Sequence, residues 1–162
     1  MKKIYNLGRA LFAVAFIAMA VAACNTMPVG FLRTEGASFS PDTLNVYHNP
    51  HASTPRYNDH RPWVSYRIQG VAGTNPINYE LADVKATEGG DAEKFKALAQ
   101  KGLLKVDGGM IVLMHEGVAQ LPTSGRYTLS LRVYNDGHSK TIDDVYTIIV
   151  GVDEPKPEQQ NP

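Results

Sequence analysis

The sequence lacks several features that are common in enzymes and in nucleic-acid-binding proteins. It contains one cysteine in 162 residues, so it forms no internal disulfide, and 16 Lys plus Arg are balanced by 16 Asp plus Glu. It has no Gly-rich phosphate-binding motif and no Gly-x-Ser-x-Gly elbow. Without a basic surplus there is no electrostatic footprint for nucleic acid. We therefore expect no nucleic-acid partner and a fold stabilised by its hydrophobic core alone.

The first 24 residues combine a basic start, an apolar run and the single cysteine. Residues 11–20 are all apolar, but a bilayer span needs about twenty such residues. The run follows Lys2, Lys3 and Arg9 and ends in Val21-Ala22-Ala23-Cys24. This order resembles the signal peptide and lipobox of bacterial lipoproteins, with an ordinary secretory signal as the alternative. The resemblance implies cleavage after residue 23 and a membrane anchor of fatty acyl chains, such as palmitate, on Cys24.

Cleavage would leave a chain of ordinary domain size with a mildly acidic balance. Residues 1–23 hold three basic and no acidic residues, so thirteen Lys plus Arg would face sixteen Asp plus Glu. Residues 24–37 show no sustained alternation and are expected to be a lipidated tether. Residues 38–152 are expected to form one folded domain. Residues 153–162 have no apolar side chain except proline, which predicts a disordered tail.

Apolar residues recur at every second position through most of residues 38–152, which is typical of half-buried strands. The clearest example is residues 125–134, where Tyr127, Leu129, Leu131 and Val133 share one face. A second β-branched run at residues 145–150 predicts an antiparallel hairpin with a loop from Asn135 to Asp144. Earlier strands are expected at residues 43–48, 62–68, 77–85, 103–106 and 110–114.

One segment departs from this alternation. In residues 91–100, Asp91 is placed to cap a short helix, and Phe95, Leu98 and Ala99 fall at helical spacing. Seven short strands, turn signals between them and one short helix predict an all-β fold. We expect a single antiparallel β-sandwich.

Three segments of the second half carry a resemblance to a known family of domains: residues 78–81, 102–106 and 121–133. Together they resemble a cadherin-like, immunoglobulin-like domain over residues 77–152. The resemblance implies that Tyr127 packs inward and that its hydroxyl bonds to nearby backbone, as in a tyrosine corner. The acidic Leu-Asp-Arg-Glu and Asp-x-Asn-Asp-Asn motifs of calcium-binding cadherin repeats are missing. We therefore expect no calcium site.

A lipobox followed by a small cadherin-like domain resembles cell-envelope lipoproteins of Bacteroidetes-type bacteria. There such domains occur in surface glycan-binding proteins, as spacers or as binding modules. The resemblance implies an outer-membrane location, on the cell surface or the periplasmic face. Residues 25–30 carry no charge, whereas surface-exported members usually have an acidic run there. We expect a monomer whose partners are the membrane, through Cys24, and polysaccharide or envelope proteins.

Aromatic and hydrogen-bonding residues gather in a polar stretch that leads into the expected strand at residues 62–68. Aromatic faces pack on the C–H faces of sugar rings, and guanidinium, amide and imidazole groups bind hydroxyls. The alternative for Trp63, the single tryptophan, is a core position, as in immunoglobulin folds. The ligand-binding candidates are Arg56, Tyr57, Asn58, His60, Trp63 and Tyr66.

The sequence patterns that would indicate metal binding or catalysis are weaker than those for ligand binding. His48, His51 and His60 straddle prolines in an expected loop, whereas metal ligands usually stand on rigid elements, so we predict no metal site. His115 and Glu116 are expected at a strand end. No pair of carboxylates faces a predicted cleft, so we expect no catalytic residue and no cofactor. The sequence favours a non-catalytic glycan-binding accessory; the alternative is a spacer or a protein-interaction domain that adds a strand at residues 43–48.

Overall fold

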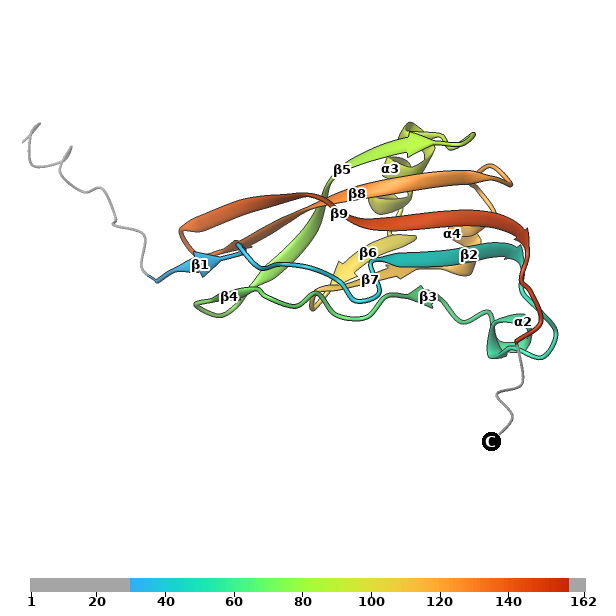
Figure 1. The fold of residues 1–162 in the computed structure, drawn as a ribbon, viewed down its shortest axis with the longest axis horizontal. Helices are drawn as coiled ribbons and strands as arrows, with labels where there is room; N and C mark the ends of the chain where they lie inside the picture. Colours follow the sequence, from blue (N-terminus) through green and yellow to red (C-terminus); the bar gives the residue numbers. More distant parts are fainter. Residues whose placement is uncertain (1–29, 158–162) are drawn as a thin grey trace, which may run out of the picture.

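The computed structural model describes residues 30–157, in which strands predominate (Figure 1). This confirms the strand-rich character expected from the sequence. Cys24 and the signal-like segment lie outside the described residues. Among residues 30–157, no helix is long and apolar enough to cross a bilayer. The elements are β1 (Leu32–Arg33), β2 (Thr43–Asn49), α2 (Pro55–Asp59), β3 (Trp63–Val64), β4 (Ala72–Gly73), β5 (Asn78–Thr87), α3 (Ala92–Gln100), β6 (Leu104–Asp107), β7 (Met110–Leu113), α4 (His115–Val118), β8 (Gly125–Asn135) and β9 (His138–Asp153).

The largest sheet has four strands in the order β2-β9-β8-β5. β8 pairs antiparallel with both β5 and β9, but β2 runs parallel to β9, with Thr43 opposite Thr147. The expected purely antiparallel arrangement is therefore wrong at this edge. A hairpin forces its two strands to be antiparallel, whereas β2 and β9 are joined only through the rest of the domain, which leaves their relative direction free.

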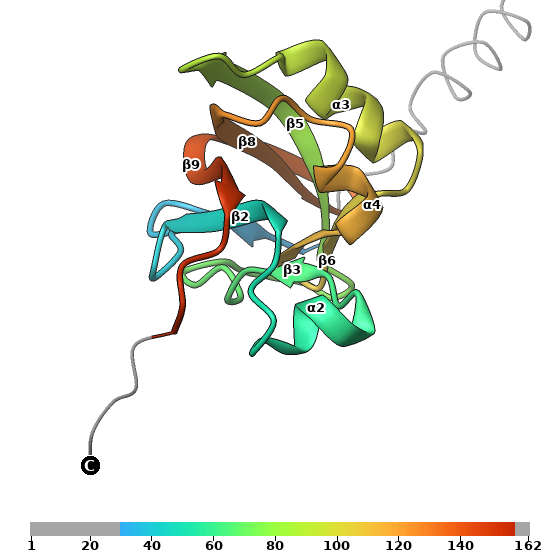
Figure 2. The same ribbon diagram turned by 90° about the vertical axis from the view of Figure 1, so that its right-hand side faces the viewer.

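A second sheet of three strands has the order β3-β7-β6, and β1 and β4 form a two-residue ladder. Both larger sheets contribute to one core, because residues of β3, β6 and β7 pack in the same buried cluster as those of β8 and β9. Figure 2 shows this arrangement, with α3 and α4 on the same side of the sheets. α3 packs against β5 and β6. The fold is thus sandwich-like, with helices covering one side.

The alternation of β8 is confirmed. Tyr127, Leu129, Leu131 and Val133 have no exposed surface. Ser130, expected on the wet face, is buried because a register shift between β8 and β9 lies beside it. Its hydroxyl accepts the backbone N–H of Asp144 at 3.0 Å, so the irregular ladder keeps its hydrogen bond.

The β8–β9 hairpin is tighter than expected. Asn135 pairs with His138 across the two-residue turn Asp136-Gly137, and Gly137 has a φ of +88°. Of the two central residues only Gly137 adopts a positive φ, which glycine tolerates because it has no Cβ. β9 therefore begins at His138, and the loop expected up to Asp144 is mostly strand.

The two segments that flank the expected domain take part in the fold. Leu32 is buried, and the side-chain amide of Asn135 donates to the carbonyls of Phe31 and Thr74 at 2.9 Å each. Residues 30–37 thus lie against the β8–β9 hairpin, although the sequence indicated a tether. At the other end β9 extends to Asp153, and Glu154 is held by the segment that leads into α2.

The predicted helix and the inward tyrosine meet at one corner, which we call the Tyr127 corner: Gly90, Asp91, Phe95, Gly125 and Tyr127. Asp91 caps α3 as expected, its carboxylate accepting from Lys94 N at 3.0 Å. The Tyr127 ring stacks on Phe95 at 4.5 Å, and its hydroxyl accepts the N–H of Asp91 at 3.1 Å. A Cβ on Gly125 would lie 2.7 Å from Gly90 Cα, so this close approach of the two backbones requires glycine at position 125.

Candidate functional site

Three of the predicted ligand-binding residues lie around one hollow beside α2, at the opposite end of the molecule from β1 (Figure 1). We call it the α2 hollow. Its volume is about 200 Å³. The residues that line it are His48, Asn49, Pro50, Arg56, Tyr57, His60 and His115.

Four segments far apart in the sequence, three of them lining the hollow, build this site. β2 ends with His48 and Asn49, α2 carries Arg56 and Tyr57, and α4 begins at His115. The fourth, the end of β9, supplies Glu154, which holds α2 in place. The stretch expected as a loop contains α2, which begins at Pro55, whose fixed φ suits a first helical turn; the Thr54 side chain at the N-cap makes no capping hydrogen bond.

His60 ends α2 in a left-handed conformation, with a φ of 48°. Such a residue turns the chain sharply at a helix C-terminus. The turn brings the His60 ring to 4.8 Å from the His115 ring, in an edge-to-face arrangement. His48 is oriented separately, its Nε2 lying 3.2 Å from the carbonyl of Pro122. Three imidazoles therefore line the hollow from three different elements.

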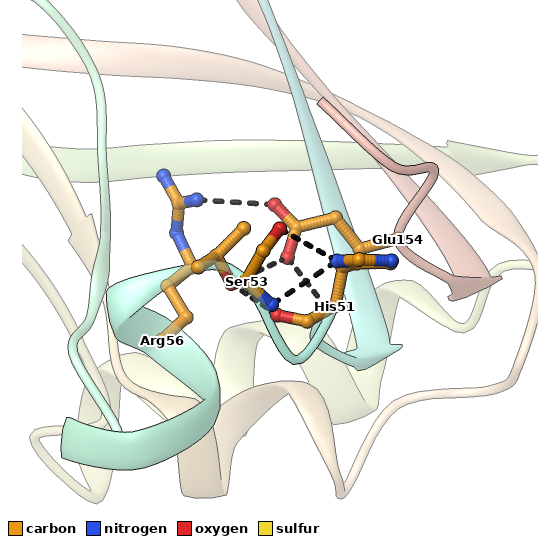
Figure 3. A network of polar contacts seen from close by, with 5 residues as sticks. His51, Ser53, Arg56 and Glu154 are labelled. Atoms are coloured by element: carbon orange, nitrogen blue, oxygen red, sulfur yellow. Dashed lines mark hydrogen bonds and ion pairs between the residues drawn. The ribbon is translucent and has the colours of Figure 1, made fainter. Parts of the chain in front are cut away.

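A polar network around Glu154 holds the segment that carries α2 (Figure 3). One carboxylate oxygen accepts from Arg56 Nη1 at 3.1 Å. The other accepts from the backbone N–H of His51 at 3.0 Å and from the Thr54 hydroxyl at 3.1 Å. His51 Nδ1 in turn accepts the backbone N–H of Ser53 at 3.1 Å. Both oxygens of Glu154 are thus occupied by groups of this one segment.

Trp63 lies beneath the hollow and not on its surface. Its side chain is 2% exposed. The Arg56 guanidinium covers its ring at 4.1 Å, and the Tyr47 ring lies 5.8 Å away on β2. The core position, left open as the alternative for this residue, is the one observed. Trp63 therefore supports Arg56 through a cation–π contact, and a sugar ring has no access to its face.

Several buried nitrogens near the hollow lack hydrogen-bond partners. Among residues 30–157 these are Arg56 Nε, Trp63 Nε1 and His115 Nδ1; one further buried polar atom without a partner, Asn135 Oδ1, lies at the β8–β9 hairpin. Buried polar groups are nearly always paired, so three such atoms at one site need a physical reason.

The other candidates are placed differently. Tyr57 is 56% exposed at the hollow, whereas Asn58 is exposed on α2 without lining the hollow. Tyr66 is 69% exposed beyond β3 and does not line the hollow either. The predicted ligand-binding residues did not include His48, Asn49, Pro50 or His115, which also line the hollow. His115 was expected at a strand end, but α4 begins there.

The described residues show no prepared metal centre. In residues 30–157 no three His, Cys, Asp or Glu side chains come close enough to hold a metal ion together. The hollow offers hydrogen-bond donors, imidazoles and one exposed aromatic ring, which suits binding of a polar ligand more than redox chemistry.

Comparisons with protein-family models, curated proteins and solved structures return no match to this chain.

Proposed function

We propose that this protein is a non-catalytic lipoprotein of the bacterial cell envelope, held in the outer membrane by acyl chains on Cys24. Its body is a cadherin-like or immunoglobulin-like sandwich, and the α2 hollow binds a glycan. The proposal is supported by the lipobox-like sequence, by the strand-rich fold and by the Tyr127 corner, where the tyrosine hydroxyl bonds to backbone.

The observation that carries glycan binding is Tyr57. It stands 56% exposed beside a concave group of Arg56, His60 and His115. An exposed phenol ring offers a face for a sugar ring, and the neighbouring polar groups can bind its hydroxyls. The hollow, at about 200 Å³, is smaller than the roughly 300–1,000 Å³ of pockets that enclose a drug-sized ligand. It therefore suits one saccharide unit of a chain that continues into solvent.

Two exposed tyrosines allow a matched test. The full chain, purified in detergent, is screened on an array of plant and host glycans, because starting the chain at Ser38 would remove β1. We expect Tyr57→Ala to weaken binding roughly tenfold and Tyr66→Ala, which alters a tyrosine outside the hollow, to leave binding unchanged. Equal effects of the two substitutions, or no glycan bound by the parent chain, would contradict the proposal.

The anchor is tested separately. Cys24→Ser removes the only thiol, so we expect the protein to leave the membrane fraction. Mass spectrometry of the parent protein should find residue 24 as the acylated N-terminus. An intact leader with an unmodified cysteine would contradict lipidation, whatever the glycan array shows.

A second candidate function is docking of an envelope protein by strand addition, supported by a groove between β5 and β6. Each of these strands is at the edge of its sheet in the part of the chain that is described, and so is β2, which contains the edge expected at residues 43–48. The groove measures about 420 Å³, and Tyr79, Leu81, Leu104 and Val106 help to line it. An added strand would slow hydrogen exchange of the β5 amides, whereas a glycan in the α2 hollow would slow exchange in α2. The element that becomes protected therefore distinguishes the two functions.

A further inference from the structure

Donors at and beneath the α2 hollow lack acceptors among the described residues. Arg56 Nε in the lining and Trp63 Nε1 beneath it are buried without a partner, and both atoms can only donate. His115 Nδ1 is also buried without a partner and donates in one of its tautomers. A buried donor without an acceptor costs free energy, about 1–3 kcal/mol by the usual measure. A ligand that supplies acceptors here would relieve that cost.

The carboxylate of Glu154, beside the hollow, does not fill this need. It already accepts from Arg56 Nη1, His51 N and Thr54 Oγ1. Its bond to Arg56 uses Nη1, which leaves the Nε–Nη2 edge of the guanidinium unused by Glu154. That edge presents two parallel N–H groups, the geometry that binds a carboxylate or sulfate in bidentate fashion. The Arg56 guanidinium lies over the Trp63 ring and pairs with Glu154 through Nη1.

The charged and titratable residues around the hollow also favour an anionic ligand. Among the described residues its lining includes one arginine and three histidines and no acidic residue, and the adjoining carboxylates of Glu154 and Asp153 are bound by Arg56 and Asn49. Glu154 offsets the charge of Arg56 but leaves the imidazoles of His48, His60 and His115 without a carboxylate partner among the described ion pairs. A neutral hydroxyl brings one donor for each oxygen, whereas an ionised acid brings acceptors only. An anionic group therefore matches the hollow better than a neutral sugar.

We propose that the α2 hollow recognises the acidic group of an anionic glycan, either the carboxylate of a uronate or a sulfate ester. This inference rests on the proposed glycan-binding function and specifies its substrate class. The acid group lies against the Nε–Nη2 edge of Arg56, with His60 and His115 beside it, and the sugar ring packs on Tyr57. Arg56 Nε is buried in the unbound protein, so this contact requires the Arg56 side chain to move when the acid group binds.

The test compares three ligands of similar size on the full chain in detergent: a galacturonate trisaccharide, a galactose trisaccharide and a sulfated galactose trisaccharide. Isothermal titration calorimetry should show that at least one acidic ligand binds ten times or more tightly than the neutral one, and that added salt weakens this binding. The arm that binds tighter, uronate or sulfate, identifies the acid group. Equal binding of the neutral ligand would overturn the inference but leave the proposed function standing, whereas binding of no glycan would overturn both.

Two variants separate recognition from loss of structure. Arg56→Lys keeps the positive charge but removes the bidentate edge, so affinity for the acidic ligand should fall roughly tenfold. Arg61→Lys makes the same change at an exposed arginine that does not line the hollow, so affinity for the acidic ligand should stay unchanged. Unfolding by heat, followed by circular dichroism, checks that both variants remain folded. Unchanged affinity in Arg56→Lys, or an equal loss in Arg61→Lys, would overturn the inference.

Discussion

The Tyr127 corner and the α2 hollow each contain or cover one buried aromatic residue near the start of a strand, Tyr127 in β8 and Trp63 in β3. The two residues differ in whether their polar atom has a hydrogen-bond partner. At the corner, the Tyr127 hydroxyl accepts the N–H of Asp91, and its ring stacks on Phe95. At the hollow, the Trp63 ring is covered by Arg56, and its indole N–H has no partner. Both rings are buried, so burial alone does not distinguish the two regions.

The two regions differ in whether the fold supplies partners for its own buried polar groups. The corner joins α3 to β8 and uses each group for packing or hydrogen bonding. The hollow keeps donors without acceptors, an arrangement that natural proteins retain mainly where a ligand, a water or an ion completes it. The corner is therefore expected to control stability, and the hollow to control binding.

The largest expected effect is at the corner. Tyr127→Ala removes a fully buried ring from between Phe95 and the β8 backbone, and should lower the free energy of unfolding by about 3–5 kcal/mol. Urea unfolding followed by circular dichroism measures it. Tyr127→Phe, which keeps the ring and removes the bond to Asp91, should cost about 1–2 kcal/mol. A loss below 1 kcal/mol for Tyr127→Ala would show that the corner is not structural.

The next effect appears in alkali and also belongs to the packed core. Burial raises the pKa of Tyr146 to about 12, because the phenolate cannot be solvated beside Phe39. Below pH 10 the hydroxyl is neutral in both states. Between pH 10 and 12 only the unfolded chain ionises, so the free energy of unfolding falls as the pH rises.

Tyr146→Phe should therefore lose less stability than the parent chain over that range. Urea midpoints at pH 9, 10 and 11 measure the difference. Tyr146→Phe should still lose some stability as the pH rises, because burial also raises the pKa of Tyr79 and Tyr127. Identical curves for Tyr146→Phe and the parent would contradict this account.

A smaller effect is expected at the border of the hollow. Glu154→Gln weakens the ion pair with Arg56, whose side chain is 32% exposed, so the cost to folding should be about 1 kcal/mol or less. Thermal unfolding measures it, and hydrogen exchange should increase in the segment from His51 to Asp59. Arg61, whose exposed pair with Asp59 lies nearby, gives the control: Arg61→Gln should change stability less than Glu154→Gln. The reverse order would mean that the Glu154 network does not hold α2.

The smallest effect on stability should accompany a tenfold effect on binding. Tyr57→Ala alters a ring that is 56% exposed, so unfolding should shift by less than about 0.5 kcal/mol. If Tyr57→Ala destabilised the protein as much as Tyr127→Phe, the contrast between the two regions would fail.

The sequence predicted the packed region better than the hollow. Alternation in β8 and the Asp91 cap depend on neighbours in the chain, so Tyr127 and its face could be assigned from local pattern alone. The parallel pairing of β2 with β9 and the depth of Trp63 depend on residues far apart. Thr54-Pro55 was a readable signal for α2, but the hollow also needs His48, His115 and Glu154, which no local pattern links.

The sequence by itself determined a strand-rich chain with one capped helix and a lipobox-like start, because side-chain alternation, capping and signal order are local properties. Three features became visible only in the tertiary structure. Trp63 lies under Arg56, the Tyr57 ring is exposed, and both carboxylate oxygens of Glu154 accept hydrogen bonds from the segment carrying α2. The physical reason is that burial and hydrogen-bond partners are set by which distant segments meet. A residue's own neighbours in the chain do not contain that information.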